Sequence, residues 1–325
     1  MGLYRAAYSQ LFPPKPTFTE KDIPAGSQVG KVYIVTGANQ GIGFELIKLL
    51  YHSGATIYLA GRSTERLDEA IKTITSITPT PQTPAVLKPL FLDLNDLAAV
   101  KASAAAFAAQ ESRLDIVWNN AGIGGAPLGT TTKQGIEGHI GVNCVGPLLF
   151  TQLLHPLLQA AAKSSSKGSV RIVWTSSPIV DMGAPKGGVD FKSIDSGKTA
   201  NSNRDYSCSK VGNWFLADEG AKRWGKDGIV SVVQNPGNLN TSAYRYQSGL
   251  MMFFVRPILS EPKFGGYTML YSGFTGDVGL ESNGAYIWPF GRKVPNVRAD
   301  IYQAIEEGKA REFWEWCEKK FKAYL

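Results

Sequence analysis

The sequence predicts an α/β fold in which a parallel sheet of about seven strands is covered by helices on both faces. Short apolar runs alternate with helical segments along most of the chain, and this alternation is typical of parallel sheets buried on both faces. The 325 residues, 43% of them hydrophobic, suffice for one large core. No repeat or flexible linker divides the pattern, so we expect a lead-in over 1–30 and a single domain over 31–325.

The individual elements follow from the spacing of apolar residues. Continuous apolar runs predict strands at 32–37, 56–61, 86–94, 114–120, 169–176, 228–235 and 284–290. Helical spacing predicts helices at 43–54, 64–77, 96–110, 132–162 and 205–224. Gly54 is placed to cap the first helix. Because ligands of such sheets bind at the carboxyl ends of the strands, we expect the functional site there.

Two long segments interrupt the alternation, and both follow strand ends. The first, 177–203, is rich in Gly, Ser and Lys, and the second, 238–262, is rich in aromatic residues and Met. Long excursions within a compact domain are usually binding loops or lids. We therefore expect 238–262 to be a lid over a bulky apolar substrate, because Met and aromatic side chains adapt to varied hydrophobic shapes.

Composition excludes several other classes of function. The net charge of +7 comes from scattered basic residues, so we expect no nucleic-acid partner. The apolar run 250–255 is too short to span a bilayer, and the N-terminus has no signal-peptide core, so we expect a cytoplasmic protein without stable membrane insertion. Three distant cysteines fit a reducing compartment. The three histidines lack metal-ligand spacing, which predicts no metal site: His52, His139 and His155.

A glycine-rich turn follows the first predicted strand. Backbone amides in such a turn, together with the N-terminus of the next helix, can hold a pyrophosphate. The turn reads TGANQGIG and contains Gly37, Asn39, Gln40, Gly41, Ile42 and Gly43. A glycine-rich turn of this kind can also be purely structural, so its meaning depends on the motifs that follow.

Arg62 stands at the end of the second predicted strand, where a cofactor with a free ribose hydroxyl would be met by an acidic residue. The first acid along the chain is Glu65. A guanidinium can pair with the additional phosphate of NADPH, which a carboxylate would repel. The sequence therefore favours NADP(H) over NAD, unless Arg62 is an ordinary surface arginine.

Tyr206 and Lys210 lie four residues apart on one face of a predicted helix. A phenol titrates near pH 10 and is a poor acid or base at neutral pH. An ammonium group nearby, joined by the positive nicotinamide of an oxidised cofactor, would lower its pKa toward the working range. The four-residue spacing alone is weak evidence for a catalytic pair. The position of the pair in the chain, after the other motifs, is the stronger evidence.

In their order, these segments resemble the short-chain dehydrogenase/reductase family over residues 31–241. The glycine turn, the stretch Asn119-Asn120-Ala121-Gly122, the Tyr206/Lys210 pair and Pro236-Gly237 carry the resemblance. Beyond residue 241 the chain is similar, more loosely, to the retinol-dehydrogenase-like branch. The resemblance implies a Rossmann-type doubly wound sheet and hydride transfer with a nicotinamide cofactor.

The resemblance also implies roles for single residues. Ser177 or its neighbour Ser176 would hold the substrate oxygen. Asn143 would hold a water that links Lys210 to solvent, or would only make a buried polar bond. Lys210 would anchor the cofactor ribose beside Tyr206. The remaining cofactor contacts are expected at Asp93, Leu94, Asn120, Ala121, Gly122, Pro236, Gly237 and Thr241.

We therefore expect an NADPH-dependent oxidoreductase, similar to a ketoreductase, that interconverts a carbonyl and an alcohol on a bulky apolar small molecule. An enone reductase or an epimerase on the same scaffold is the nearest alternative, because fold does not fix the reaction. A nucleotide-sensing protein without turnover is an alternative from another class, although it would not need the pair Tyr206 and Lys210. Family members often form homodimers through the two long helices that carry Asn143 and Tyr206, which makes a homodimer possible.

Overall fold

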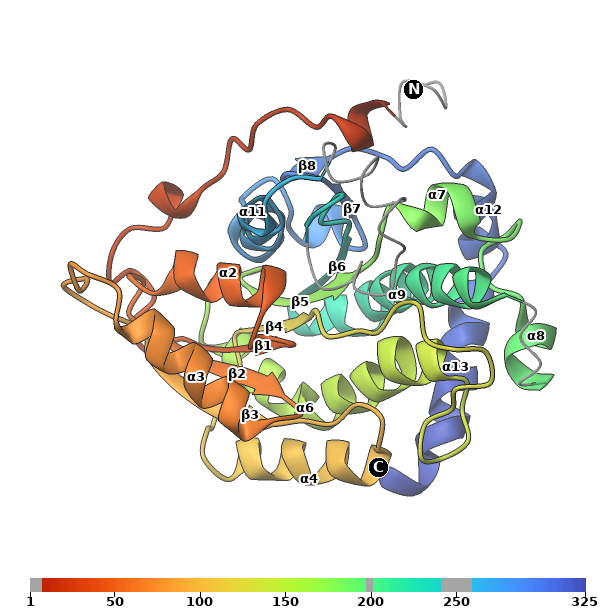
Figure 1. Ribbon diagram of the computed structural model, residues 1–325, viewed down its shortest axis with the longest axis horizontal. Coiled ribbons are helices and arrows are strands. Elements are labelled where there is room, and N and C mark those ends of the chain that lie inside the picture. Colours follow the sequence, from red (N-terminus) through yellow and green to blue (C-terminus); the bar gives the residue numbers. More distant parts are fainter. Residues whose placement is uncertain (1–7, 197–200, 241–258) are drawn as a thin grey trace.

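A single eight-stranded sheet forms the centre of the molecule (Figure 1). The computed structural model describes residues 8–196, 201–240 and 259–325. The strands lie in the order β3-β2-β1-β4-β5-β6-β7-β8, and all neighbours are parallel except β7 and β8. Their bounds are β1 Val32–Thr36, β2 Thr56–Gly61, β3 Val86–Phe91, β4 Ile116–Asn119, β5 Val170–Thr175, β6 Ile229–Gln234, β7 Tyr286–Trp288 and β8 Arg292–Lys293. This order is the Rossmann-type doubly wound topology, as predicted, with a short antiparallel eighth strand at one edge.

Helices cover both faces of the sheet. On one face lie α2 Gly41–Leu50, α3 Thr64–Thr75 and α11 Pro262–Phe274. On the other lie α4 Leu97–Ala108, α6 Gly146–Lys163, α9 Ser202–Trp224, α12 Ala299–Glu306 and α13 Lys309–Phe321. Shorter helices are α5 Gly138–Ile140, α7 Ile179–Gly183 and α8 Phe191–Ser196.

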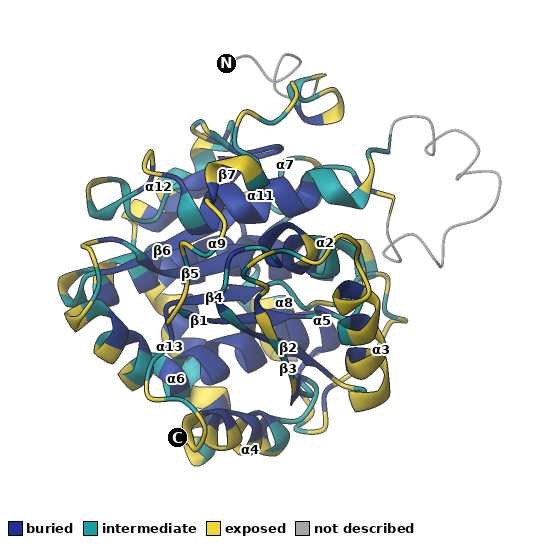
Figure 2. Ribbon diagram, turned by 90° about the vertical axis from the view of Figure 1, so that its left-hand side faces the viewer, coloured by how far each residue is buried: buried dark blue, intermediate teal, exposed yellow. Residues whose placement is uncertain are grey.

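The sheet separates two hydrophobic core clusters, one beneath each helical layer. In Figure 2 the central strands and the inner faces of the helices are buried, whereas most exposed residues lie on the outer helix faces and in loops. All residues of β1, β4, β5 and β6 are buried. These four strands are therefore the central ones, and their carboxyl ends form the floor of any site above them.

The predicted helix over 132–162 begins later than its apolar pattern indicates. Gly135 has a φ of 75°, and Thr131 and Glu137 form an isolated antiparallel bridge, so 131–137 is a tight loop. The Glu137 carboxylate then accepts hydrogen bonds from the amides of His139 and Ile140, which starts α5. The following segment Gly141–Val145 is a π-helical turn that joins α5 to α6.

Other predictions were wrong at the ends of elements or in the loops. Gly54 does not cap α2, which ends at Leu50, although its φ of 79° requires glycine in the next loop. The strand predicted over 86–94 ends at Phe91. The helices α7, α8, α11 and α12 were not predicted, because their segments lack a clear apolar repeat.

The C-terminal helix α13 packs against α9 and α6. Its aromatic residues Trp314, Trp316 and Phe321 are buried, as expected for packing residues. Because α13 lies on the long helices through which a homodimer is expected, a dimer on that face would have to include or displace α13. The homodimer stays a prediction.

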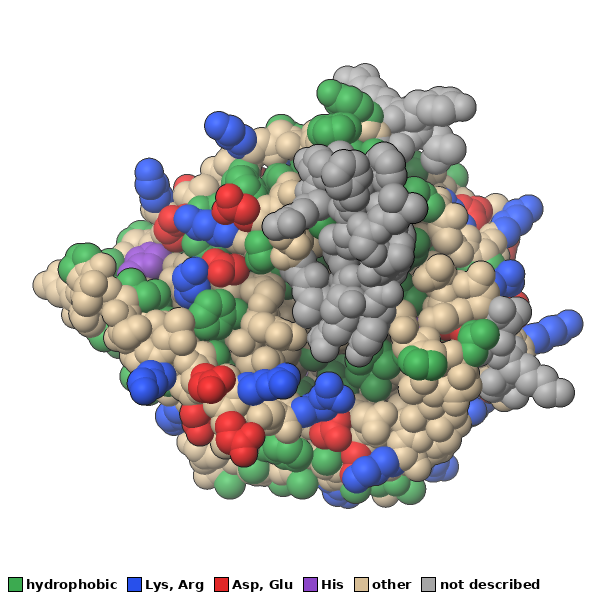
Figure 3. Space-filling view, viewed as in Figure 1, with side chains coloured by type: hydrophobic (Ala, Val, Ile, Leu, Met, Phe, Trp, Pro, Cys, Tyr) green, Lys and Arg blue, Asp and Glu red, His purple; other side chains and the backbone are tan. Residues whose placement is uncertain are grey.

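Among the described residues, one helical span, 138–163, is long and apolar enough to cross a membrane. In the most apolar 18-residue window of this span, 72% of the residues are buried, because the helix packs beneath the sheet. We therefore interpret it as a core helix. On the face shown in Figure 3, basic and acidic side chains are interspersed, in agreement with the scattered charge of the sequence.

Arg171 in β5 is a buried cation that fastens the sheet to α11 and the loop after it. Its guanidinium is 5% exposed and donates to four main-chain carbonyls, at 2.6 to 3.1 Å. Burial lowers its pKa to about 10, which still leaves it charged at neutral pH. The acceptors belong to Gly168, Ser272, Thr275 and Val278.

The substitution Arg171→Met should lower the free energy of unfolding by about 3 kcal/mol, because it leaves buried carbonyls without donors. Chemical denaturation followed by circular dichroism measures this change. Arg311→Met is the control, because Arg311 is exposed on α13. A loss no larger than that of the control would show that the four hydrogen bonds add little to stability.

Candidate active site

The glycine-rich turn joins β1 to α2 and requires glycine at three positions. Gly37 and Gly41 have φ values of 66° and 63°, which only glycine adopts readily. At Gly43, a Cβ atom would lie 2.8 Å from Asn120 Nδ2 and 2.9 Å from the Gly37 carbonyl oxygen. The turn thus brings the predicted residues Asn39, Gln40 and Ile42 to the N-terminus of α2, where free amides can hold a phosphate.

The turn after β4 lies directly beside the glycine turn. The Thr36 hydroxyl accepts hydrogen bonds from the amides of Asn120 and Ala121, at 2.9 and 2.8 Å. Asn120 Nδ2 in turn donates to the Thr36 carbonyl at 2.7 Å. The next residue, Gly122, has no room for a side chain, because a Cβ would lie 2.9 Å from Asn143 Oδ1. The predicted cofactor wall therefore forms a continuous edge with the glycine turn.

Two arginines stand free at the end of β2 and the start of α3. Arg62 is exposed, and Arg66 lines a surface pocket of about 610 Å³ together with Asn39 and Gln40. Neither guanidinium has an ion-pair partner within the part of the chain that the structure describes. The sequence analysis missed Arg66. The available signal was its position four residues after Arg62, in the first turn of α3, near where a phosphate would bind.

Asp93 and Leu94 follow β3, as predicted. The Asp93 carboxylate accepts a hydrogen bond from the Asn95 amide at 3.0 Å, which turns the chain toward α4. Leu94 is buried, and its carbonyl lies against Gly146, where a Cβ would approach it to 2.8 Å. Both residues therefore lie at the carboxyl edge of the sheet, near the start of α6.

Tyr206, Ser177 and Lys210 form one group at the carboxyl end of β5. The hydroxyl of Ser177 lies near enough to the phenol of Tyr206 to lower its pKa. The Lys210 ammonium lies 5.5 Å from the centre of the Tyr206 ring and donates to the Thr175 carbonyl at 3.0 Å. Ser176 is buried and donates instead to the Lys210 carbonyl at 2.9 Å. Of the two adjacent serines, Ser177 is the one that contacts Tyr206.

Burial shifts the pKa values of Tyr206 and Lys210 in opposite directions. It raises the pKa of the Tyr206 phenol, against a lowering contribution from the Ser177 hydrogen bond. It lowers the pKa of Lys210 to about 8. Both pKa shifts have the same cause, because a low-dielectric site disfavours the charged form of each side chain. In the protein without cofactor, the pKa of the Tyr206 phenol is therefore raised. That an oxidised cofactor lowers this pKa stays a prediction.

Asn143 lies in the π-helical turn and is 1% exposed. Its Oδ1 accepts from the Ile123 amide at 2.8 Å, and its Nδ2 donates to the Ile123 carbonyl and to Ser209 Oγ, both at 2.9 Å. The side-chain amide of Asn143 therefore makes buried polar bonds within the protein, which was the alternative to holding a water. Its main-chain carbonyl has no α-helical partner, because residue 147 is proline and lacks an N–H.

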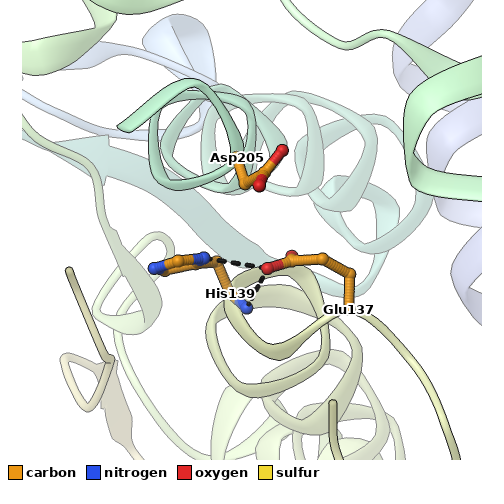
Figure 4. A group of neighbouring side chains, drawn as sticks. All are labelled: Glu137, His139 and Asp205. Carbon is orange, nitrogen blue, oxygen red and sulfur yellow. Dashed lines mark hydrogen bonds and ion pairs between the residues drawn. The ribbon is translucent and has the colours of Figure 1, made fainter. Parts of the chain in front are cut away.

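A buried polar cluster, Glu137, His139 and Asp205, lies beside Tyr206 (Figure 4). His139 Nδ1 contacts the Glu137 carboxylate at 2.8 Å, and its Nε2 lies 3.3 Å from the Ala126 amide. The His139 ring centre is 5.9 Å from that of Tyr206. Both ring nitrogens of His139 therefore have partners within the described chain.

Pro236 and Gly237 form the turn after β6. Gly237 has a φ of 94°, and its amide donates to the Asn235 side-chain carbonyl at 3.0 Å. Leu239 and Ser260 form a bridge, so the two ends of the predicted lid 238–262 meet beside this turn. Thr241 and the apolar run 250–255 lie outside the described residues. The structure therefore brings together every predicted site residue that it describes along the carboxyl edge of the sheet.

Comparisons with known proteins agree with this arrangement. A family model described as short chain dehydrogenase matches residues 31–248. The short-chain dehydrogenase/reductase iacJ of Pestalotiopsis fici is 60% identical over 319 residues, which cover 98% of each chain. The short-chain dehydrogenase/reductase pkfC of Emericella nidulans is 40% identical over 313 residues, covering 95% of this chain and 98% of that protein.

Solved structures show the same fold at lower identity. The Pseudomonas aeruginosa RhlG/NADP active-site complex has a TM-score of 0.62 and 22% identity, with 81% of this chain and 96% of that chain covered. The NADPH-bound carbonyl reductase from chicken fatty liver has a TM-score of 0.58 and 22% identity, with 80% and 96% covered. The matched family model, the two relatives and the order of motifs lead to one conclusion: the chain belongs to the short-chain dehydrogenase/reductase family of oxidoreductases.

Proposed function

We propose that the protein uses NADP(H) to interconvert a carbonyl and an alcohol on a bulky apolar small molecule. The observation that carries the proposal is the group of Tyr206, Ser177 and Lys210 beside the joined turns of β1 and β4. A phenol and a neighbouring hydroxyl can both form hydrogen bonds to one substrate oxygen. The ammonium nearby can tune the phenol, so this group is suited to move a proton to or from that oxygen.

The residues of the nucleotide side fit NADP(H). Gly37, Gly41 and Gly43 leave the backbone open at the N-terminus of α2, which suits a pyrophosphate. Arg62 and Arg66, which have no ion-pair partner within the described chain, offer two positive charges to the additional phosphate. When bound, the cofactor supplies the hydride that passes to the carbonyl carbon. Two solved relatives of this fold are complexes with NADP or NADPH, which supports the same cofactor here.

The side chains of the site have distinct roles in this mechanism. Ser177 orients the substrate oxygen, and Tyr206 donates a proton to it during reduction or accepts one during oxidation. Lys210 anchors the ribose and, in its charged form, lowers the pKa of the phenol. We expect the main-chain carbonyl of Asn143 to hold a water, through which the proton on Lys210 can be exchanged with solvent.

The substrate class rests on the composition of the lid and not on its structure. The segment 238–262 is rich in aromatic residues and Met, which favour bulky apolar shapes. Enone reduction and epimerisation use the same scaffold and are distinguished by the product. A nucleotide sensor without turnover would not require Tyr206, Ser177 and Lys210 in contact.

Replacing Tyr206 by Phe should lower kcat about a hundredfold or more, because the proton donor is lost while the ring remains. NADPH absorbance over a panel of ketones, aldehydes and enones measures the rate, and product analysis identifies the reduced bond. Tyr324→Phe, on the turn after α13, should leave the rate unchanged. Full activity of Tyr206→Phe would refute the proposed mechanism.

Replacing Arg62 or Arg66 by Ala should each lower the preference for NADPH over NADH about tenfold, because a charge-assisted contact to the additional phosphate is lost. Dissociation constants from cofactor fluorescence give the preference directly. Arg311→Ala controls for the loss of one positive charge. An unchanged preference in both variants would mean that other residues recognise the phosphate.

The affinity for NADPH should fall as the pH rises from 7 to 9.5. The pKa of Lys210 is lowered to about 8, so its ammonium is charged below that pH and is lost above it, together with its contact to the ribose. Fluorescence titrations at several pH values measure the affinity. In Lys210→Met the affinity should be weaker and nearly independent of pH over this range, and an equally steep profile in that variant would contradict the assignment.

A further inference from the structure

Gln10, from the N-terminal lead-in, is buried at the carboxyl ends of β6 and β7 and is 5% exposed. The segment around it is held by Arg292, which donates to Ser9 Oγ at 2.7 Å and to the Ser9 carbonyl at 3.0 Å. The lead-in contains no motif that the sequence analysis could interpret. In Figure 1 the lead-in runs along the outside of α2 and α11, and its first described turn lies near β8.

The side-chain amide of Gln10 makes two hydrogen bonds to different parts of the chain. Its Nε2 donates to Asp181 Oδ2 in α7, and its Oε1 accepts from Asn235 Nδ2 at the end of β6. Asp181 is four residues beyond Ser177, and Asn235 is two residues before Gly237. One buried side chain therefore connects the turn of the proposed substrate-binding serine to the turn of the proposed cofactor-binding glycine.

Each partner of Gln10 is bonded onward to its own turn. Asn235 Oδ1 accepts from the Gly237 amide at 3.0 Å, so the orientation of the Asn235 amide sets the position of the Gly237 turn. On the other side, the Ile179 amide donates to Ser177 Oγ at 3.3 Å, which ties the first turn of α7 to the serine. A change at Gln10 would therefore be passed to both turns.

The helix α7 is also held from the C-terminal side of the chain. Asn296 Nδ2 donates to Asp181 Oδ1 at 3.0 Å, and Arg298 donates to the Val180 carbonyl at 2.6 Å and the Pro185 carbonyl at 2.9 Å. Gln10 is thus one of two amides that bind the Asp181 carboxylate. Without it, one oxygen of a largely desolvated carboxylate would lack its protein donor, which favours a shift of α7 toward water.

We infer that Gln10 is a positioning residue of the active site, which fixes the distance between the Ser177 turn and the Gly237 turn. The inference rests on the proposed function for the roles of these two turns. Its physical basis is that reacting groups must be held within fractions of an ångström, so that a displacement of about 1 Å can cost about a hundredfold in rate. The N-terminal lead-in is then part of the active-site framework.

The test exchanges the two hydrogen-bonding groups. Gln10→Ala removes both bonds, and Gln10→Glu places two carboxylates in contact. The double variant Gln10→Glu/Asp181→Asn reverses donor and acceptor, so that the bonds to residue 181, Asn235 and Asn296 can all form again. Leu11→Ala is the control, because Leu11 is adjacent and 37% exposed.

Two measurements are made on each full-length variant: kcat/KM with the best carbonyl substrate of the panel, and the fluorescence of bound NADPH, whose nicotinamide would lie between the two turns. We expect Gln10→Ala and Gln10→Glu to lower kcat/KM about tenfold or more and to change the bound NADPH emission. The double variant should recover both, and Leu11→Ala should retain both. Circular dichroism gives the folded fraction for correction.

The outcomes separate this inference from the proposed function. If the wild type reduces no carbonyl, or Tyr206→Phe is fully active, the proposed function fails, and the NADPH emission still tests Gln10. Wild-type emission and kcat/KM in Gln10→Ala would overturn the inference. So would a loss that only follows the folded fraction, or a double variant no better than Gln10→Glu.

Discussion

The hydrogen bonds between Thr36 and Asn120 hold together the carboxyl ends of β1 and β4, and the whole site is built on this junction. The order of the sheet reverses at these two strands, which opens the crevice where ligands of such folds bind. Because the Asn120 amide occupies the space beside Gly43, the first turn of α2 must be free of a side chain there. The glycine spacing is therefore a packing requirement of the junction as well as a condition for binding phosphate.

Burial holds Tyr206 and Lys210 in place, but it also disfavours the charged forms of both side chains. Lys210 is 5% exposed and donates to the Thr175 main-chain carbonyl, and within the described chain it forms no ion pair with a carboxylate. Burial alone would favour a neutral amine and a protonated phenol. A cofactor that brings phosphates and ribose oxygens into the crevice would restore favourable partners to the ammonium. The same reasoning explains why Arg62 and Arg66 can stay unpaired beside the glycine turn.

Much of the fold could be predicted from the sequence because its central strands are buried on both faces. The strand Val170–Thr175 is apolar except for Arg171 and Thr175, and the predicted motifs directly follow strands of this kind. Element ends were predicted less well, since they depend on contacts that a periodicity does not contain. The start of α5 is set by the Glu137 carboxylate, and the loop before it by the positive φ of Gly135.

The same limit explains which site residues could be predicted. Tyr206 and Lys210 share a helix face, so their spacing places them together. Ser176 and Ser177 could not be distinguished from the sequence, because successive side chains at a strand end point to opposite faces of the sheet and only the structure shows which one faces the site. Gln10 gave no signal, since its partners at 181 and 235 are more than 170 residues away.

The C-terminal helix α13 has a further consequence for biosynthesis. The α9 residue Gly212 is tightly packed, since a Cβ there would lie 2.8 Å from Phe313, and Arg298 binds α7 beside the serine turn. Both contacts come from the last thirty residues of the chain. During translation, strands β1 to β6 therefore emerge from the ribosome before the helix with Tyr206 and Lys210 receives its outer support. The catalytic edge is completed only after residues 298–313 have left the exit tunnel.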